Sequence, residues 1–408
     1  MYKKVCIYSA LVLGFICPCA AGEPGTAVST AAQIQSTISA STAASVFPKL
    51  LWEKKLSKSI TSSAISKDGS KIAIADETGY LTLYNTKGEK LWGYHYEGKL
   101  PKRTYEFKSD KADTAILNIT FSSGGKFIIC DLGVLNAWRK YPQGGEENIA
   151  LHVRNKKMCF NSEGKLLWQT SKEGTHLIGG DRYVLVVVWP EGDEESSEYS
   201  VFNIEGKLLY KGSTAGQDSS YGFSEDGKYF FIEKKLIETR SGRIIWELSK
   251  GVFVGIGKEH VLRTEWREEL GRYTCRMYDI TTQKKLLDMN EFGELLSDNY
   301  AFGRESTMGA TTITAYKLKT NGVAWTDRYD VGDFSSRYVL SYLTKDEKYL
   351  FVGGEKGLRL YDIGGKEMWR LPVRNKVEWY QYFRYPVAEN GEYVLFGHNR
   401  SVRLYKSF

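Results

Sequence analysis

The sequence lacks a long apolar run in its main part, a dense basic tract and, after the N-terminal segment, an even number of cysteines. No stretch beyond residue 22 approaches the ~20 apolar residues that a membrane helix needs, so no transmembrane segment is expected there. The formal net charge of +7 comes from 56 Lys and Arg residues against 49 Asp and Glu residues. Because this small excess is spread thinly along the chain, binding to nucleic acid is not expected.

The chain also lacks the short motifs that carry common enzyme chemistry. It has no G-x-S-x-G, H-E-x-x-H, P-loop, C-x-x-C or EF-hand pattern. GIGKEH (255–260) begins like a nucleotide-binding glycine pattern, but it lacks the third glycine and is expected to be a turn. The five histidines fall in different repeats, so each is expected on the surface or at a strand edge: His95, His152, His176, His260 and His398. The sequence therefore predicts no catalytic residue, no cofactor and no metal site.

Residues 1–22 have the order of features found in a secretory signal peptide. Lys3 and Lys4 precede an apolar run over 5–16, and the small residues at 20–22 offer a cleavage site. We therefore expect an exported protein that is periplasmic, at the cell surface or secreted, with an uncleaved membrane anchor as the alternative. Residues 23–48 are dominated by Ser, Thr and Ala and are expected to form a flexible leader before a folded domain at 49–408.

The cysteines indicate thiols rather than disulfides. Cys17 and Cys19 lie near the end of the apolar run, but a lipid anchor is not favoured because no small residue directly precedes either cysteine. Only Cys130, Cys159 and Cys275 follow the leader, and an odd number excludes a fully paired disulfide framework. Cys130 and Cys159 are expected on neighbouring strands but several residues out of register, which is poor geometry for a bridge. We expect three buried thiols.

One pattern with an aromatic anchor recurs along the chain, as in NSEGKLLWQT (161–170) and DIGGKEMWRL (362–371). The anchors of its strong and weak copies are Trp92, Trp168, Tyr210, Trp246, Leu287, Trp325 and Trp369. Their spacing runs from 36 residues (Tyr210 to Trp246) to 44 residues (Trp325 to Trp369), with one interval of 76 residues (Trp92 to Trp168). We interpret that interval as a single repeat with long connections.

A second pattern precedes many copies of the first, as in SKDGSKIAIA (66–75) and AENGEYVLF (388–396). Asp-Gly and Asn-Gly favour tight hairpin turns, and each is followed by a short β-branched or aromatic run. Each repeat therefore reads as a four-stranded antiparallel meander. A period of about 40 residues with four strands predicts a β-propeller, in which the anchor aromatics pack between blades.

The two ends of the repeat array are incomplete in complementary ways. The last repeat (387–408) stops before a Trp-bearing strand, whereas 49–56 is such a strand without the rest of its blade. We expect the N-terminal strand to pair with the C-terminal blade. This closure predicts an all-β, eight-bladed propeller with four-stranded antiparallel blades; seven blades are the alternative.

The recurring G-K-x-L-W pattern resembles the quinoprotein-like, or PQQ-like, β-propeller repeats across essentially all of 49–408. The resemblance implies the propeller fold, which serves enzymes and scaffolds alike. Dehydrogenases that resemble this family use adjacent cysteines beside the quinone, together with acidic and amide ligands for calcium. No Cys-Cys pair occurs in this sequence, so the resemblance favours a non-enzymatic branch.

The longest connections between expected strands belong to one face of the propeller, and basic and aromatic residues gather in them. The basic–aromatic face predicted for a protein partner comprises Lys102, Arg103, Tyr105, Trp138, Arg139, Tyr141, Arg374, Trp379, Tyr380 and Tyr382. Aromatic residues and arginine are enriched at protein interfaces. The alternative is that the aromatics pack the last inner strand and the charges are simply solvated.

The sequence as a whole predicts an exported, non-catalytic propeller that binds or assembles protein partners and is itself monomeric. Two other functions stay open: a quinone- or metal-dependent oxidoreductase, and a carbohydrate-binding propeller that uses exposed aromatics.

Overall fold

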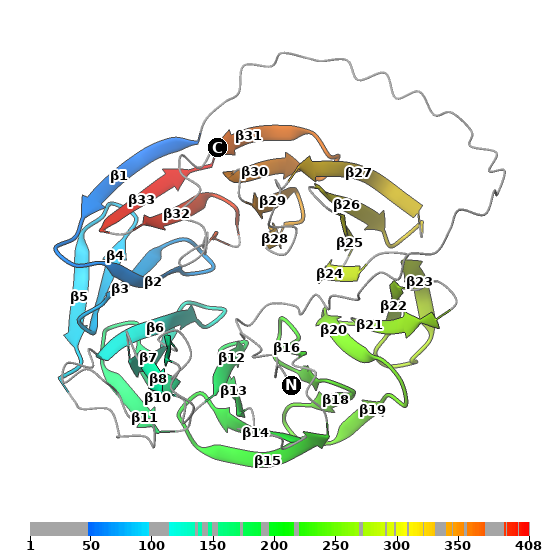
Figure 1. Cartoon of the computed structure of the whole chain (residues 1–408), viewed down its shortest axis with the longest axis horizontal. Coiled ribbons are helices and arrows are strands. Elements are labelled where there is room, and N and C mark those ends of the chain that lie inside the picture. Colours follow the sequence, from blue (N-terminus) through cyan, green and yellow to red (C-terminus); the bar gives the residue numbers. More distant parts are fainter. Residues whose placement is uncertain are drawn as a thin grey trace.

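The computed structural model is a ring of small β-sheets that stand like blades around a common centre (Figure 1). Seven sheets have four strands and one has three, which together make eight blades. The structure describes residues 48–407 except for 98–113, 135–137, 141–145, 149–153, 172–173, 189–195, 216–219, 269–271, 290–291, 298, 308–309, 321, 331–339, 345, 355–356, 372–386, 389 and 399.

The first four blades follow one another around the ring, and each runs from an inner strand to an outer strand. Blade 1 comprises β2 (Ile60–Ile65), β3 (Lys71–Asp76), β4 (Tyr80–Asn85) and β5 (Lys90–His95). Blade 2 comprises β6 (Thr114–Phe121), β7 (Phe127–Val134), β10 (Arg154–Asn161) and β11 (Leu166–Thr170). Blade 3 comprises β12 (Thr175–Gly179), β13 (Tyr183–Val188), β14 (Ser196–Asn203) and β15 (Leu208–Ala215). Blade 4 comprises β16 (Tyr221–Phe223), β17 (Tyr229–Ile232), β18 (Lys235–Glu238) and β19 (Ile244–Glu247).

The next three blades repeat this order. Blade 5 comprises β20 (Val252–Ile256), β21 (His260–Arg267), β22 (Arg272–Asp279) and β23 (Lys285–Met289). Blade 6 comprises β24 (Phe292–Leu296), β25 (Tyr300–Thr307), β26 (Ala310–Lys317) and β27 (Gly322–Asp330). Blade 7 comprises β28 (Leu340–Leu343), β29 (Tyr349–Gly354), β30 (Gly357–Asp362) and β31 (Glu367–Leu371). The interval of 76 residues between Trp92 and Trp168 is thus one blade, as expected, with the extra hairpin β8 (Trp138–Lys140) and β9 (Glu146–Asn148) between β7 and β10.

The eighth blade joins the two ends of the repeat array. β32 (Tyr393–His398) pairs with β33 (Ser401–Lys406), and β33 pairs in turn with β1 (Lys49–Lys55). Val387 forms an isolated bridge with Val394 on the inner side of this sheet. The predicted closure by the N-terminal strand is confirmed, and so is the count of eight blades.

Aspartate side chains hold the inner hairpin turns. Asp68 accepts a hydrogen bond of 2.5 Å from Ser66 Oγ and one of 3.0 Å from the Ser70 N–H. Asp226 and Asp346 accept equivalent bonds in blades 4 and 7. These bonds satisfy turn backbone groups locally, so the carboxylates serve structure at these positions.

The core is divided into separate apolar layers, one at each junction between neighbouring blades. Between blades 1 and 2, Leu83 packs with Ile116 and Phe160. At the closing junction between blades 8 and 1, Leu404 packs with Ile72. Because strand side chains alternate between faces, a central strand of a blade contributes to two layers, and no blade buries both of its faces alone.

Among the described residues, the aromatic anchor of the recurring pattern bonds to the next blade at five of the eight junctions. The indole N–H of Trp92 in blade 1 donates a hydrogen bond of 2.9 Å to the Ser162 carbonyl in the corresponding turn of blade 2. Gly164 of that turn has a positive φ of 86°, and a Cβ there would lie 2.7 Å from the Trp92 ring. The glycine therefore serves both the turn and the close approach of the ring. The same N–H or O–H to carbonyl contact joins Trp52 to Thr86, Trp168 to Ile204, Tyr210 to Thr239 and Trp325 to Ile363.

The prediction of three buried thiols is confirmed, but the predicted register of Cys130 and Cys159 is wrong. Cys130, Cys159 and Cys275 are buried free thiols. Cys130 lies opposite Met158, so Cys159 is offset by one position and not by several. Adjacent positions of a strand point to opposite faces, and indeed Cys130 lies in the layer between blades 1 and 2 and Cys159 in the layer between blades 2 and 3. Blade 2 itself separates the two sulfur atoms.

Candidate partner-binding face

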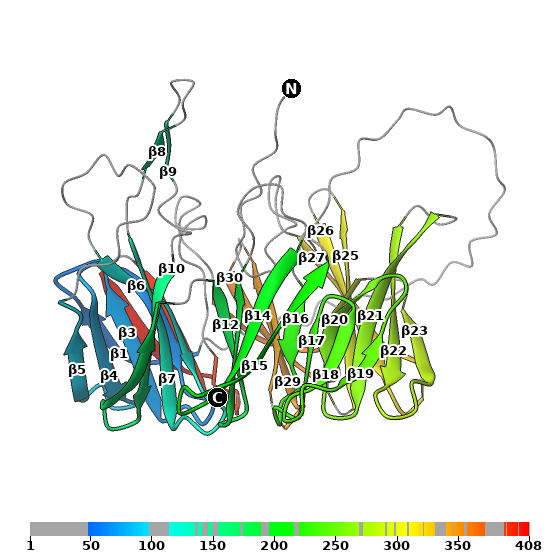
Figure 2. The same ribbon diagram turned by 90° about the horizontal axis from the view of Figure 1, so that it is seen from below.

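The propeller has one face of tight turns and one face of longer connections. Turns between the first and second and between the third and fourth strands of a blade share one side, because the strands are antiparallel. Figure 2 shows these turns on its lower side and the β8–β9 hairpin standing above the blades. We refer to the upper side in Figure 2 as the loop face. GIGKEH lies on the turn side, where the Gly257 N–H donates to the His260 carbonyl, so it is a blade turn as expected.

The predicted basic–aromatic face falls almost entirely outside the described residues. Trp138 and Arg139 lie in β8, opposite Asn148 and Glu147 of β9. The remaining members have no described position: Lys102, Arg103, Tyr105, Tyr141, Arg374, Trp379, Tyr380 and Tyr382. The structure therefore places one short hairpin of this face.

A second projection of the loop face is the hairpin of β21 and β22 in blade 5. Trp266 and Tyr273 lie directly opposite each other near its tip. Their rings meet edge to face with centroids 5.0 Å apart, yet Trp266 is 43% and Tyr273 40% exposed. Neither residue belongs to the face predicted from the sequence, although both flank the connection at 267–272. An aromatic residue on each side of that loop was the signal that could have found the pair.

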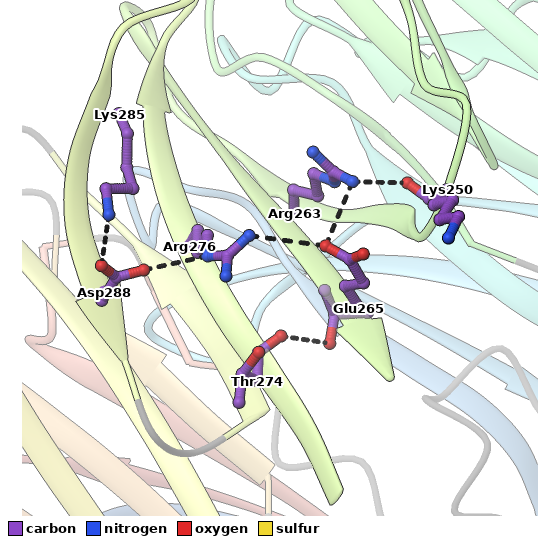
Figure 3. A network of polar contacts seen from close by, with 8 residues as sticks. Lys250, Arg263, Glu265, Thr274, Arg276, Lys285 and Asp288 are labelled. Carbon is purple, nitrogen blue, oxygen red and sulfur yellow. Dashed lines mark hydrogen bonds and ion pairs between the residues drawn. The ribbon is translucent and has the colours of Figure 1, made fainter. Parts of the chain in front are cut away.

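The opposite flank of the same hairpin carries a ladder of charges (Figure 3). Arg263 of β21 and Arg276 of β22 are directly opposite each other in register. Glu265 bridges them, with its Oε2 atom 3.2 Å from Arg263 Nη2 and 3.4 Å from Arg276 Nη1. Without this carboxylate two guanidinium groups would face each other directly, so Glu265 is what allows the pair.

The ladder continues outward to β23. Arg276 Nε donates a hydrogen bond of 2.9 Å to Asp288, and Lys285 Nζ lies 2.5 Å from the same carboxylate. The hydrogen bond from Lys285 is the main cause that lowers the pKa of Asp288 below its usual value. Asp288 is therefore ionised at neutral pH and fixes the position of Arg276.

A buried polar cluster ties blade 2 to blade 3. Lys157 Nζ donates to Asp131 Oδ1 at 3.0 Å and to the Gly174 carbonyl at 2.7 Å. His176 of β12 approaches the same Asp131 oxygen with its Nδ1 atom at 2.8 Å, and Asn118 donates to the other oxygen at 3.4 Å. The side chains of Asp131, Lys157 and His176 are all 0% exposed, so no substrate reaches them as they stand. The cluster holds two blades together.

This cluster corrects one sequence expectation. His176 was expected at the surface or a strand edge, but it is 2% exposed and packs against Asp131 across a blade junction. His95 fits the expectation better, since it stacks on the exposed ring of Tyr80 with centroids 4.0 Å apart. Within the described residues no group of His, Cys, Asp and Glu side chains has the arrangement of a metal site.

The buried thiols are poor nucleophiles. Burial raises the pKa of Cys159 to about 12 and that of Cys130 well above its ordinary value. A thiol attacks as the thiolate, so these two positions are unreactive at neutral pH.

A shallow pocket lies where blade 8 meets blade 1. It has a volume of about 270 Å³ and is lined by Leu56, Ser57, Ile74, Ala75, Asp76, Tyr80, Thr82 and Tyr84. Asp76 in its wall accepts hydrogen bonds from the Thr78 N–H and hydroxyl. These bonds give the carboxylate a role in the local turn.

Comparison with known proteins finds similarity of fold. No protein-family model matches the chain, and no curated protein matches its sequence. Among solved structures, BamB from Moraxella catarrhalis matches with a TM-score of 0.51 at 13% identity, over 88% of this chain and 100% of that one. The Dos1 propeller matches with a TM-score of 0.56 at 10% identity, over 88% of this chain and 95% of that one. No helix in the described part of the chain is long and apolar enough to cross a membrane. At these identities the chain is similar to both proteins in being a β-propeller.

Proposed function

We propose that the chain is an exported, non-catalytic β-propeller of the PQQ-like repeat type that binds protein partners through its loop face. The observation that carries this proposal is the projection of two hairpins, β8–β9 and β21–β22, from a ring whose blades are fastened to one another. A rigid scaffold that presents projecting elements on one face is the usual arrangement of a binding surface.

Two physical features favour binding over chemistry. The fully buried cluster of ionisable side chains, Asp131 with Lys157 and His176, is enclosed between blades and holds them together. The hairpin of blade 5 carries exposed aromatic residues on one flank and arginines on the other, and Trp, Tyr and Arg are the residues that contribute most binding energy at protein interfaces. We propose that the protein acts as a monomer and that the basic–aromatic face forms part of its binding surface.

Export is part of the proposal and rests on residues 1–22 of the sequence. The N-terminus of the protein purified from its native cells, read by mass spectrometry, should begin near residue 23. A chain that retains residues 1–22 and fractionates with soluble cytoplasmic proteins would contradict export.

The test of partner binding is affinity capture of the full chain from its native envelope or secretion fraction, with bound molecules identified by mass spectrometry. Lys102, Arg103 and Arg374 are reversed together to Glu in one variant. A control variant reverses three exposed lysines of the turn side, Lys87, Lys207 and Lys284. We expect the same protein partners with the wild type and the control, and their loss with the first variant.

Other results of the capture experiment would support an oxidoreductase or a carbohydrate-binding propeller instead. A bound quinone, metal or glycan without a protein partner would contradict the proposal. Redox activity after addition of quinone and calcium would point to an oxidoreductase, and retention on polysaccharide to a carbohydrate-binding propeller. Equal capture by both charge variants would exclude the basic–aromatic face.

A further inference from the structure

The pocket between blades 8 and 1 lies at the loop-face end of their junction. Its lining residue Asp76 is the last residue of β3, and Tyr80 is the first residue of β4. Leu56 and Ser57 line it from the other blade, directly after β1. The β3–β4 and β1–β2 connections both belong to the loop face, since one joins the second and third strands of a blade and the other joins two blades. The pocket is therefore a depression in the face that we propose for binding.

The ring of Tyr80 lines this pocket and is supported on one side by a second ring. Tyr80 lies directly opposite His95 of β5, and the two rings stack with centroids 4.0 Å apart at an interplanar angle of 10°. The Nε2 atom of His95 lies 3.2 Å from the carbonyl oxygen of Thr78. A carbonyl only accepts, so the imidazole donates in this hydrogen bond, which fixes its orientation. The Tyr80 ring is thus held by a neighbour that is itself held by the backbone.

The second face of the Tyr80 ring is turned toward the pocket. In the sheet of blade 1, β4 lies between β3 and β5. His95 therefore approaches the ring from the outer strand, whereas the pocket residues Ile74 and Asp76 lie on the inner strand. Tyr80 is 47% exposed although His95 covers one side of its ring. A flat ring with one covered face and one open face is suited to stack against a second flat, apolar surface.

The polar groups of the pocket have capacity left for hydrogen bonds. Asp76 uses Oδ1 in the turn, where it accepts from the N–H and hydroxyl of Thr78 and from the Tyr80 N–H. Within the described residues no hydrogen bond engages its Oδ2. Burial raises the pKa of Tyr84, so this hydroxyl keeps its proton at neutral pH and is able both to donate and to accept. Three residues add hydroxyl groups to the lining: Ser57, Thr82 and Tyr84.

The charges around the pocket favour an uncharged ligand. The carboxylate of Asp76 lies in the lining, and the ammonium group of Lys54 lies over the ring of Tyr84, 5.1 Å from its centroid. A cationic ligand would be repelled by Lys54, and an anionic ligand by Asp76. A neutral ligand with several hydroxyl groups is able to hydrogen-bond to the lining without bringing a charge near either group.

We propose that this pocket binds a neutral hexose residue of a glycan. The C–H face of the sugar ring stacks on the open face of Tyr80, one sugar hydroxyl donates to Asp76 Oδ2, and others exchange hydrogen bonds with the hydroxyl groups of the lining. The pocket volume of about 270 Å³ lies just below the usual range for small-molecule sites, so one sugar residue enters it. This is a binding activity beyond the proposed protein binding, and its residues are separate from the basic–aromatic face.

The test applies the full chain to an array of neutral and charged oligosaccharides that contain glucose, mannose or galactose. The affinity of each bound oligosaccharide is then measured by calorimetry for the wild type, Tyr80→Ala, Tyr80→Phe, Asp76→Asn and Tyr273→Ala. Asp76→Asn keeps an acceptor oxygen for the turn but replaces the second oxygen by an amide NH₂ group. Tyr273 of blade 5 is the matched control, because it is an exposed tyrosine, 40% accessible, that also contacts another ring. Thermal unfolding checks that each variant keeps the fold, as expected for exposed positions.

We expect neutral oligosaccharides to bind the wild type. Their affinity should fall by about tenfold or more with Tyr80→Ala, because the main apolar contact is lost, and should be largely kept with Tyr80→Phe. Asp76→Asn should also weaken binding, since a donor then faces the sugar hydroxyl. Tyr273→Ala should bind as the wild type does. An array on which no neutral oligosaccharide binds, or equal affinity of Tyr80→Ala and the wild type, would overturn the proposal, as would a preference for charged oligosaccharides.

The capture experiment separates this inference from the proposed function. Tyr80→Ala should capture the same protein partners as the wild type, because the two surfaces are separate. Loss of those partners with Tyr80→Ala, together with no oligosaccharide binding, would assign the pocket to a side chain of the partner and overturn the glycan site while protein binding stands. Oligosaccharide binding that is lost with Tyr80→Ala, without any captured protein, would support the glycan site and contradict the proposed function.

Discussion

The indole N–H of Trp168 donates a hydrogen bond of 2.7 Å to the carbonyl of Ile204, which lies 36 residues further along the chain and in the next blade. The same relation joins four other pairs of neighbouring blades. Trp369 in blade 7 differs from these anchors: its Nε1 atom is buried without a hydrogen-bond partner among the described residues. In blade 8 the third and fourth strands are β33 and β1, which are not consecutive in the sequence, so no tight turn joins them.

This difference predicts that Trp168→Phe lowers the free energy of unfolding more than Trp369→Phe, although Trp369 is the more buried ring. Trp168→Phe removes a hydrogen bond and leaves the Ile204 carbonyl unsatisfied, which should cost about 1–2 kcal/mol beyond the loss of packing. Trp369→Phe removes a donor that makes no bond, and so it loses packing alone. Trp369 is the more deeply buried ring, at 3% exposed, so packing alone would make Trp369→Phe the worse variant. Urea unfolding should show Trp168→Phe as the less stable; the reverse order would contradict a stabilising role for the indole bond.

Ring closure predicts a large effect at the N-terminal strand. Trp52 packs in the layer between blades 8 and 1 and donates to the Thr86 carbonyl at 2.9 Å. Trp52→Ala should lower the free energy of unfolding by about 3 kcal/mol, the lower end of the range for tryptophan truncation, because the ring is only partly buried. Leu50→Ala on the same strand is the control, since Leu50 is 46% exposed and should change little. A melting temperature unaffected by Trp52→Ala would mean that β1 adds nothing to the closed ring.

The fold could be predicted because its signal is repeated. The anchor spacing and the Asp-Gly turns encode the same blade many times, so an error in one copy does not alter the whole. The contacts at the blade junctions and the exposed flanks of the blade-5 hairpin could not be predicted in this way. Asp131 and His176 meet because two blades are placed side by side, and nothing in either strand alone marks the pairing. Glu265 stands clear of blade 4 because blade 4 is short, which depends on how far neighbouring strands pair.

The buried cluster predicts that removing the charge of Lys157 alone destabilises the fold more than removing the charges of both Lys157 and Asp131. Lys157→Met leaves the Asp131 carboxylate buried beside His176 without its cation and should cost about 3–5 kcal/mol. Adding Asp131→Asn to that variant removes the stranded charge and should recover part of the loss. Lys165→Met, at an exposed position of the same blade, should lie within about 0.5 kcal/mol of the wild type. If the double variant is as unstable as the sum of its single variants, the two side chains are not coupled.

The raised pKa of Cys159 predicts a specific loss of stability in alkali. The thiol of the unfolded chain, with an ordinary pKa of 9.0, releases its proton above that pH, whereas the folded thiol keeps its proton up to a pKa of about 12. The folded state therefore binds more protons between pH 9 and 12, and this residue should lower the free energy of unfolding by about 1.4 kcal/mol per pH unit in that range. Cys159→Ala lacks the titrating group, so its stability should fall less steeply between pH 9 and 11 than that of the wild type. Parallel curves for the two proteins would show that the thiol titrates alike in the folded and unfolded states, and that blade 2 does not shield its sulfur from water.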